Sequence, residues 1–111
     1  MDSVVDIISR QVELADTIPL MTSDDYKERF IAEYWQNEIR IRKLDRLLAQ
    51  DRDGTLPFVM TRESRVLLKS QINRMGDLSD VLQMRAEYEN IDLSEACLWR
   101  LIKQHQTFTT E

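Results

Sequence analysis

Residues 25–48 read DYKERFIAEYWQNEIRIRKLDRLL, and the fold class follows from their pattern. One set of positions recurs at alternating four- and three-residue steps, the spacing of a helix face that packs along a near-parallel or antiparallel neighbour. This stripe consists of Phe30, Tyr34, Asn37, Ile41, Leu44 and Leu48. We therefore predict a long amphipathic helix that begins after the capping acceptors of residues 23–25 and runs to Gln50.

A turn and a second long helix follow. Residues 51–57 hold Gly54 and Pro57, one of the two glycines and one of the two prolines of the chain, and predict a reversal of direction. The next helix is expected from near Thr61 or Ser64 to about Asn90. Its predicted inward face comprises Leu68, Met75, Leu78, Leu82 and Arg85 or Ala86. Gly76 inside this helix indicates simple tolerance or the close approach of another backbone or a ligand.

Shorter elements flank this hairpin. Apolar spacing over residues 2–15 predicts a short helix, and Pro19 predicts a linker over residues 17–23. Asp92 and Glu95 have the spacing of a capping box and predict a last helix to about Gln104, with fraying over residues 107–111. The fold class is all-α, with one domain over residues 1–111: an N-terminal helix and linker (1–22), the helical hairpin (23–91), and a C-terminal helix and tail (92–111).

Composition and charge bound the class of protein. The chain has 111 residues, the size of one domain, and a formal net charge of -5, which disfavours nucleic acid as a partner. The excess of acidic over basic residues lies almost wholly in residues 1–26, whereas residues 27–65 carry nine basic and seven acidic residues. The lone Cys97 indicates a reducing compartment, and we expect neither a leader nor a membrane span.

The sequence offers little for catalysis. His105 is the single histidine, and no glycine-rich phosphate loop, zinc motif or nucleophile elbow is present. We therefore predict a protein that is not an enzyme, with no catalytic residue, no metal site and no cofactor.

An aromatic and basic cluster marks the start of the first long helix. Rings that can stack on a base alternate with cations that can pair with a phosphate, so Tyr26, Lys27, Arg29 and Arg42 are the candidate ligand-binding residues. The alternative is that the aromatic residues form the core or a subunit interface. On that interpretation Tyr34, Trp35 and Asn37 lie at an interface between copies, because two long apolar stripes exceed what one hairpin covers. A homo-oligomer is therefore expected.

Both hairpin arms resemble a known group of proteins. Residues 25–44 and the second arm, LLKSQINRM (67–75) and VLQMRAE (81–87) with the continuation to Leu93, are similar to small helical-hairpin proteins of tailed and crAss-like bacteriophages. These in turn resemble the hairpin domain of phage sponge proteins, which counter the CBASS and Thoeris defences by sequestering cyclic nucleotide or cyclic ADP-ribose messengers. The resemblance implies an oligomer, commonly a hexamer, with ligands held between subunits.

Two functions remain open at this point. The first is an immune-evasion protein that binds a cyclic nucleotide or cyclic ADP-ribose messenger without degrading it, in the cytoplasm of the host cell. The alternative is a non-enzymatic scaffold that uses its apolar stripe to bind another protein and takes no small ligand.

Overall fold

The computed structural model describes residues 10–109 of the chain. A 3-10 turn, η1 (Leu14–Thr17), precedes four α-helices: α2 (Ile18–Met21), α3 (Tyr26–Asp53), α4 (Arg62–Glu89) and α5 (Glu95–Thr109). Over these residues there is no strand, so the all-α prediction is confirmed.

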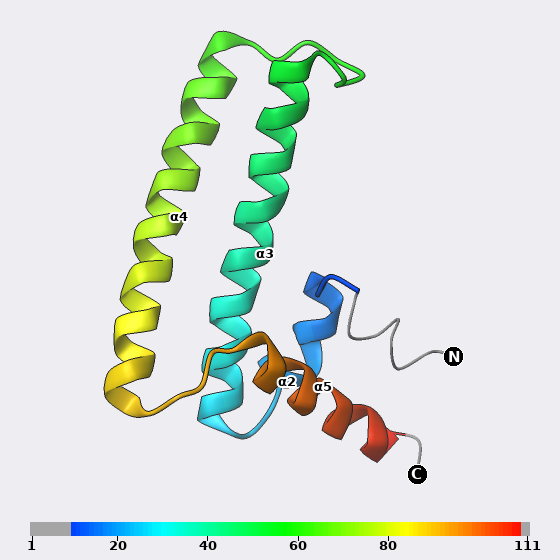
Figure 1. Cartoon of the computed structure of the whole chain (residues 1–111), viewed down its shortest axis with the longest axis vertical. Helices are drawn as coiled ribbons and strands as arrows, with labels where there is room; N and C mark the ends of the chain where they lie inside the picture. Colours follow the sequence, from blue (N-terminus) through cyan, green and yellow to red (C-terminus); the bar gives the residue numbers. More distant parts are fainter. Residues whose placement is uncertain (1–9, 110–111) are drawn as a thin grey trace.

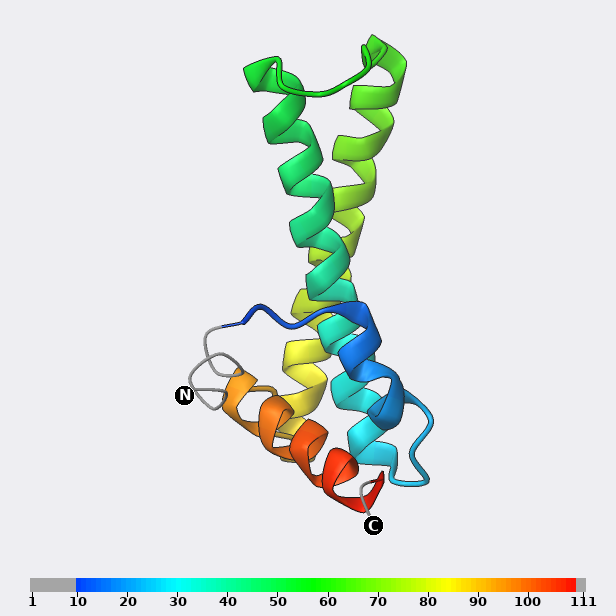
Figure 2. The same ribbon diagram turned by 90° about the vertical axis from the view of Figure 1, so that its right-hand side faces the viewer.

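The two long helices stand side by side and run in opposite directions (Figures 1 and 2). The helix starts lie where the sequence predicts, since the side chains of Asp25 and Thr61 cap the first turns. The first long helix continues past the predicted end at Gln50 to Asp53, because Gly54 (φ 75°) is the residue that leaves the helical conformation, and Asn90 (φ 60°) closes the second helix in the same left-handed region. Asn37 joins the arms because its side-chain amide donates to the carbonyl of Met75 at 2.8 Å. The predicted stripe of the first helix therefore does face the second.

The buried core lies at the base of the hairpin, where η1, α2 and α5 pack against it (Figure 2). The core residues are Val12, Leu20, Phe30, Ile31, Ala32, Trp35, Ile39, Leu82, Ala86, Ile91, Cys97, Leu98 and Ile102. Between residues 40 and 78 the one buried side chain is that of Met60. The hairpin thus consists of a well-packed base and a long arm of two helices.

Near the N-terminus the predicted boundaries are wrong. The expected helix over residues 2–15 lies partly outside the described residues, and residues 10–13 are not helical. The expected linker over 17–23 contains α2, because Pro19 sits in the first helical turn, where its missing N–H costs nothing. Thr17 anchors this segment: its buried hydroxyl donates to the Leu14 carbonyl at 2.7 Å and accepts from the Gln36 amide at 2.9 Å.

The C-terminal helix also differs from the prediction. Ser94, not Asp92, caps α5, since the Ser94 hydroxyl accepts from the backbone N–H of Cys97 at 3.2 Å while Asp92 accepts from the N–H of Ser94. The helix continues past Gln104 to Thr109. One contact near its end is the 2.8 Å pair between His105 Nε2 and Glu28 Oε1 on α3, which holds α5 beside the hairpin.

One position of the predicted inward face of α4 is wrong, because Leu78 is exposed. Of the two alternatives Arg85 and Ala86, Arg85 is exposed and Ala86 is the one that is buried. Around Gly76, nothing in the described residues would lie within 4 Å of an added Cβ. Within the described part of the chain no other backbone approaches that glycine, which fits tolerance at an open position, and the approach of a ligand there stays a prediction.

Candidate functional site

The base of the hairpin carries an exposed cluster of aromatic and charged side chains. Asp25 accepts from the backbone N–H of Lys27 at 2.9 Å, so Tyr26 is the first residue of α3. Arg85 and Glu89 lie one turn apart near the end of α4 and face Tyr26. The buried ring of Phe30 lies beneath them. We call Tyr26, Phe30, Arg85 and Glu89 the base cluster.

Hydrogen bonds fix the geometry of the base cluster. Arg85 Nη2 donates to the phenol oxygen of Tyr26 at 2.8 Å, and Tyr26 donates to Glu89 Oε1 at 2.9 Å. The Arg85 guanidinium carbon lies 4.7 Å from the centroid of the Phe30 ring, a cation–π distance. Tyr26 retains 46% of its surface exposed. A planar cation and a half-exposed phenol together can stack on a flat ring and pair with an anion.

The structure brings three of the four candidate ligand-binding residues to one end of the hairpin. Tyr26 belongs to the base cluster, and the exposed Lys27 lies next to it in the first turn of α3. Arg29 turns toward the preceding loop and donates to the carbonyl of Ser23 at 2.7 Å. Arg42 lies about 24 Å from Tyr26 along the axis of α3, at a rise of about 1.5 Å per residue. Its role in the same site stays a prediction.

The three candidate interface residues make contacts inside this chain. The Trp35 indole donates to the Leu93 carbonyl at 3.1 Å, and the Arg42 guanidinium lies 5.7 Å from its ring centroid. Tyr34 packs edge-on against Trp35 at 5.6 Å. Trp35 and Asn37 are each only 8% exposed. These contacts tie α3 to α4 and to the loop before α5, and a role between copies stays a prediction.

A second polar set lies between the long helices above Trp35. The buried hydroxyl of Ser79 donates to Glu38 Oε2 at 2.6 Å, and the Gln83 amide donates to Ser79 at 3.3 Å and to the Tyr34 phenol oxygen at 3.4 Å. Burial raises the pKa of the Tyr34 phenol, and the nearby Glu38 carboxylate raises it further. The phenol therefore stays protonated at neutral pH and acts as a hydrogen-bond partner.

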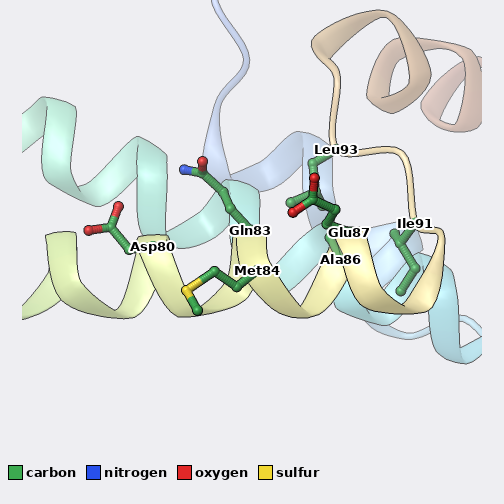
Figure 3. A pocket seen from close by; sticks show the side chains of 7 residues that line it. All are labelled: Asp80, Gln83, Met84, Ala86, Glu87, Ile91 and Leu93. Carbon is green, nitrogen blue, oxygen red and sulfur yellow. The ribbon is translucent and has the colours of Figure 1, made fainter.

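A cleft of about 670 Å³ opens beside this polar set. Figure 3 shows Asp80, Gln83 and Glu87 leaving α4 on the side where Leu93 lies. The remaining lining residues are Met84, Ala86 and Ile91. Because two carboxylates and no basic side chain line the cleft, it suits a neutral or cationic group and disfavours a phosphate. Of the two places, the base cluster is the better candidate for an anionic ligand.

Sequence reasoning missed the α4 side of the site. The apolar pattern gives Arg85 only as an alternative to Ala86 on the inward face, and it does not identify Glu89, Ser79 or Gln83 as site residues. One signal was present, since Arg85 precedes Glu89 by four residues, the spacing of an ion pair on a helix surface. The pairing of Tyr26 with residues more than fifty positions away has no local signal.

Other kinds of site are not found in the described residues. Among residues 10–109 no group of three or more His, Cys, Asp or Glu side chains is placed to hold a metal ion. None of the helices in that range combines the length and apolar content that a bilayer span requires.

Comparison with known proteins gives one family. The family model described as Sequestin matches residues 24–88. The chain belongs to the Sequestin family. The match begins just before the Asp25 cap and ends one residue before the end of α4, so the Sequestin portion is the hairpin itself, including the Tyr26–Arg85 contact. The elements η1, α2 and α5 lie outside it. No curated protein and no solved structure matches the chain.

Proposed function

We propose that this Sequestin is a bacteriophage protein that sequesters a nucleotide-type defence messenger, a cyclic oligonucleotide or a cyclic ADP-ribose isomer, without degrading it. The observation that supports this proposal is the match of the Sequestin family to the hairpin, whose name denotes sequestration. The likeness of the same residues to phage proteins that counter CBASS and Thoeris points to the class of ligand. Sequestration requires affinity and copy number, and it requires no catalytic group.

The base cluster is the proposed contact for the ligand. Tyr26 offers a ring face, Arg85 offers a guanidinium oriented by two hydrogen-bond partners, and Lys27 adds a second cation next to them. A nucleotide would stack on the phenol ring and place a phosphate against the guanidinium. Glu89 now neutralises Arg85, so the bound phosphate would replace that carboxylate as the partner of the guanidinium.

The proposal includes self-association in the cytoplasm of the host cell. Arg42 is too far along α3 to reach a ligand held by Tyr26 of the same chain. It would join such a site only from a second subunit, which is the arrangement expected of an oligomer, commonly a hexamer, with ligands between subunits.

Isothermal titration calorimetry against a panel of cyclic di- and trinucleotides and cyclic ADP-ribose isomers tests the proposal. We expect at least one ligand with a Kd below about 10 μM, which corresponds to about -7 kcal/mol. Arg85→Gln should weaken that binding at least tenfold, because a charge-assisted contact is worth roughly 1.5–3 kcal/mol. Arg52→Gln is the matched control, since Arg52 is an exposed arginine at the opposite end of the hairpin. Binding by no member of the panel would refute the proposal.

Recovery of the ligand separates sequestration from degradation. After the complex is denatured by heat, chromatography should return the messenger intact and in full amount. A converted product would show that the protein is an enzyme.

The alternative function is a protein-binding scaffold, and one observation favours it. The side of α4 that faces away from α3 exposes several large apolar side chains. On this interpretation no nucleotide of the panel binds, and a specific protein partner competes for that side of α4.

A further inference from the structure

The outward side of α4 is an apolar surface with no partner among residues 10–109. In Figure 1 no other described element lies on the side of α4 that faces away from α3. The large apolar residues exposed on α4 are Val66, Leu67, Leu78, Val81, Met84 and Tyr88. Two shallow hollows of about 420 and 350 Å³ lie along its first half, and Leu67 lines both. A surface of this kind on a soluble helix marks a contact with another chain.

The exposed residues on this side follow a seven-residue repeat. Positions separated by alternating four- and three-residue steps form one seam along the whole helix: Glu63, Leu67, Ser70, Arg74, Asp77, Val81, Met84 and Tyr88. All eight are exposed. This is the spacing of the contact seam of a coiled coil, in which each residue of one helix meets a position on a facing helix.

The charges within the seam identify the facing helix. At its centre lie Arg74 and Asp77, which make no ion pair with any described residue of the chain. A parallel copy of α4 would place arginine against arginine and aspartate against aspartate, which is repulsive. An antiparallel copy with its two-fold axis between Met75 and Gly76 places each Arg74 opposite Asp77 of the second copy. The two ion pairs then form reciprocally, as two-fold symmetry requires.

The remaining seam positions match in the same register. Leu67 lies opposite Met84 of the second copy, Ser70 opposite Val81, and Glu63 opposite the phenol of Tyr88, which can donate to the carboxylate. A shift by one repeat in either direction places Asp77 opposite Leu67 or Val81, which buries a carboxylate against an apolar side chain. Of these three registers, only the first pairs Asp77 with a cation.

The geometry points to a two-fold homodimer in which α4 packs antiparallel against α4 of a second copy. This inference rests on the proposed function only for its expectation of self-association, because no nucleotide takes part in the contact. Tyr26 and Lys27 lie outside the seam of this dimer. Ligand binding and the assembly of dimers into a larger oligomer therefore remain compatible with it.

Charge reversal at the centre of the seam tests the contact. The full chain is examined by analytical ultracentrifugation without nucleotide, where we expect a dimer or a multiple of it. Arg74→Asp and Asp77→Arg each create two like-charge pairs per dimer and should weaken association at least tenfold. The double variant with both changes exchanges the charges and should associate as the wild type does. Circular dichroism confirms that each variant is folded, which both exposed positions should allow.

Cross-linking tests the orientation. When Leu67→Cys and Met84→Cys chains are mixed and oxidised, disulfides should join the two different chains. Wild type, which has only the buried Cys97, is the control. Disulfides within each single variant alone would show a parallel pairing and refute the inference, as would a monomeric wild type at 100 μM, on the order of the weakest interfaces considered specific. A protein that dimerises as described but binds no nucleotide would refute the proposed function alone.

Discussion

Replacing Trp35 by phenylalanine separates a core role from an interface role. The indole of Trp35 is 8% exposed, donates to the Leu93 carbonyl at 3.1 Å and packs edge-on against Tyr34 at 5.6 Å. Phenylalanine keeps one ring and loses the donor and the second ring. The Leu93 carbonyl then loses the only side-chain donor described for it, at the point where the loop before α5 meets α3.

The expected loss has two parts. The hydrogen bond contributes about 1 kcal/mol. The missing ring removes packing contacts and leaves a small cavity, which costs about 1–2 kcal/mol, less than complete truncation of such a side chain. Together the free energy of unfolding should fall by about 2–3 kcal/mol, equivalent to roughly 10 °C in Tm for a domain of this size.

Urea unfolding followed by circular dichroism measures this loss, and Trp99→Phe is the matched control. The Trp99 indole is only partly buried and donates to the exposed Glu95 at 3.2 Å, so its replacement should cost less than about 1 kcal/mol. Repeating the Trp35→Phe measurement over a range of protein concentrations separates the two roles. If Trp35 is a core residue, its substitution lowers the free energy of unfolding by the same amount at every concentration. A loss below 1 kcal/mol, or a loss that disappears at high concentration, would refute the assignment of Trp35 to the core.

Two further predictions concern the hairpin's turn and its arms. The Arg65 guanidinium holds the pKa of the Asp51 carboxyl below its ordinary value of 3.8. This pair therefore stabilises the fold above pH 3.8, and its contribution is lost as the pH falls through the lower pKa of the folded state. NMR titration of Asp51 should show the lowered pKa, and Arg65→Gln should return that pKa toward 3.8. Gly54→Ala should destabilise by about 1 kcal/mol because Gly54 has φ 75°, whereas Gly76→Ala should stabilise by about 0.5–1 kcal/mol because Gly76 is helical with open space around it. Thermal denaturation of the two alanine variants should give Tm shifts of opposite sign, and shifts of the same sign would contradict this account.

The long helices were predictable because their signals are local and repeated. The stripe through Phe30 and Asn37, the caps at Asp25 and Thr61, and the glycine turn each lie within a few residues of the feature they determine. The short elements were not predictable in the same way. Pro19 has opposite meanings in the middle and in the first turn of a helix, and tertiary packing of the buried Thr17 and Leu20 decides between them.

The candidate site was predictable on one side only. Tyr26 was identified from the residues around it, whereas its partners Arg85 and Glu89 depend on how α4 is rotated about its own axis. The period of the apolar residues could not fix that rotation. Both sides of α4 carry apolar residues at helical spacing, so exposed Met84 and buried Leu82, which lie on opposite sides of the helix, are equivalent in the pattern.

That ambiguity has a physical cause that links the fold to self-association. A helix with one apolar side has one rotation that buries it, but α4 has two such sides and α3 covers only one of them. Between residues 40 and 78 only Met60 is buried, so two helices alone give this part of the arm little core to offset the entropy of ordering it. An antiparallel α4 from a second copy would supply a third helix over the arm and cover the second side. The seam that made the rotation of α4 ambiguous in the sequence is therefore the one that a second copy requires.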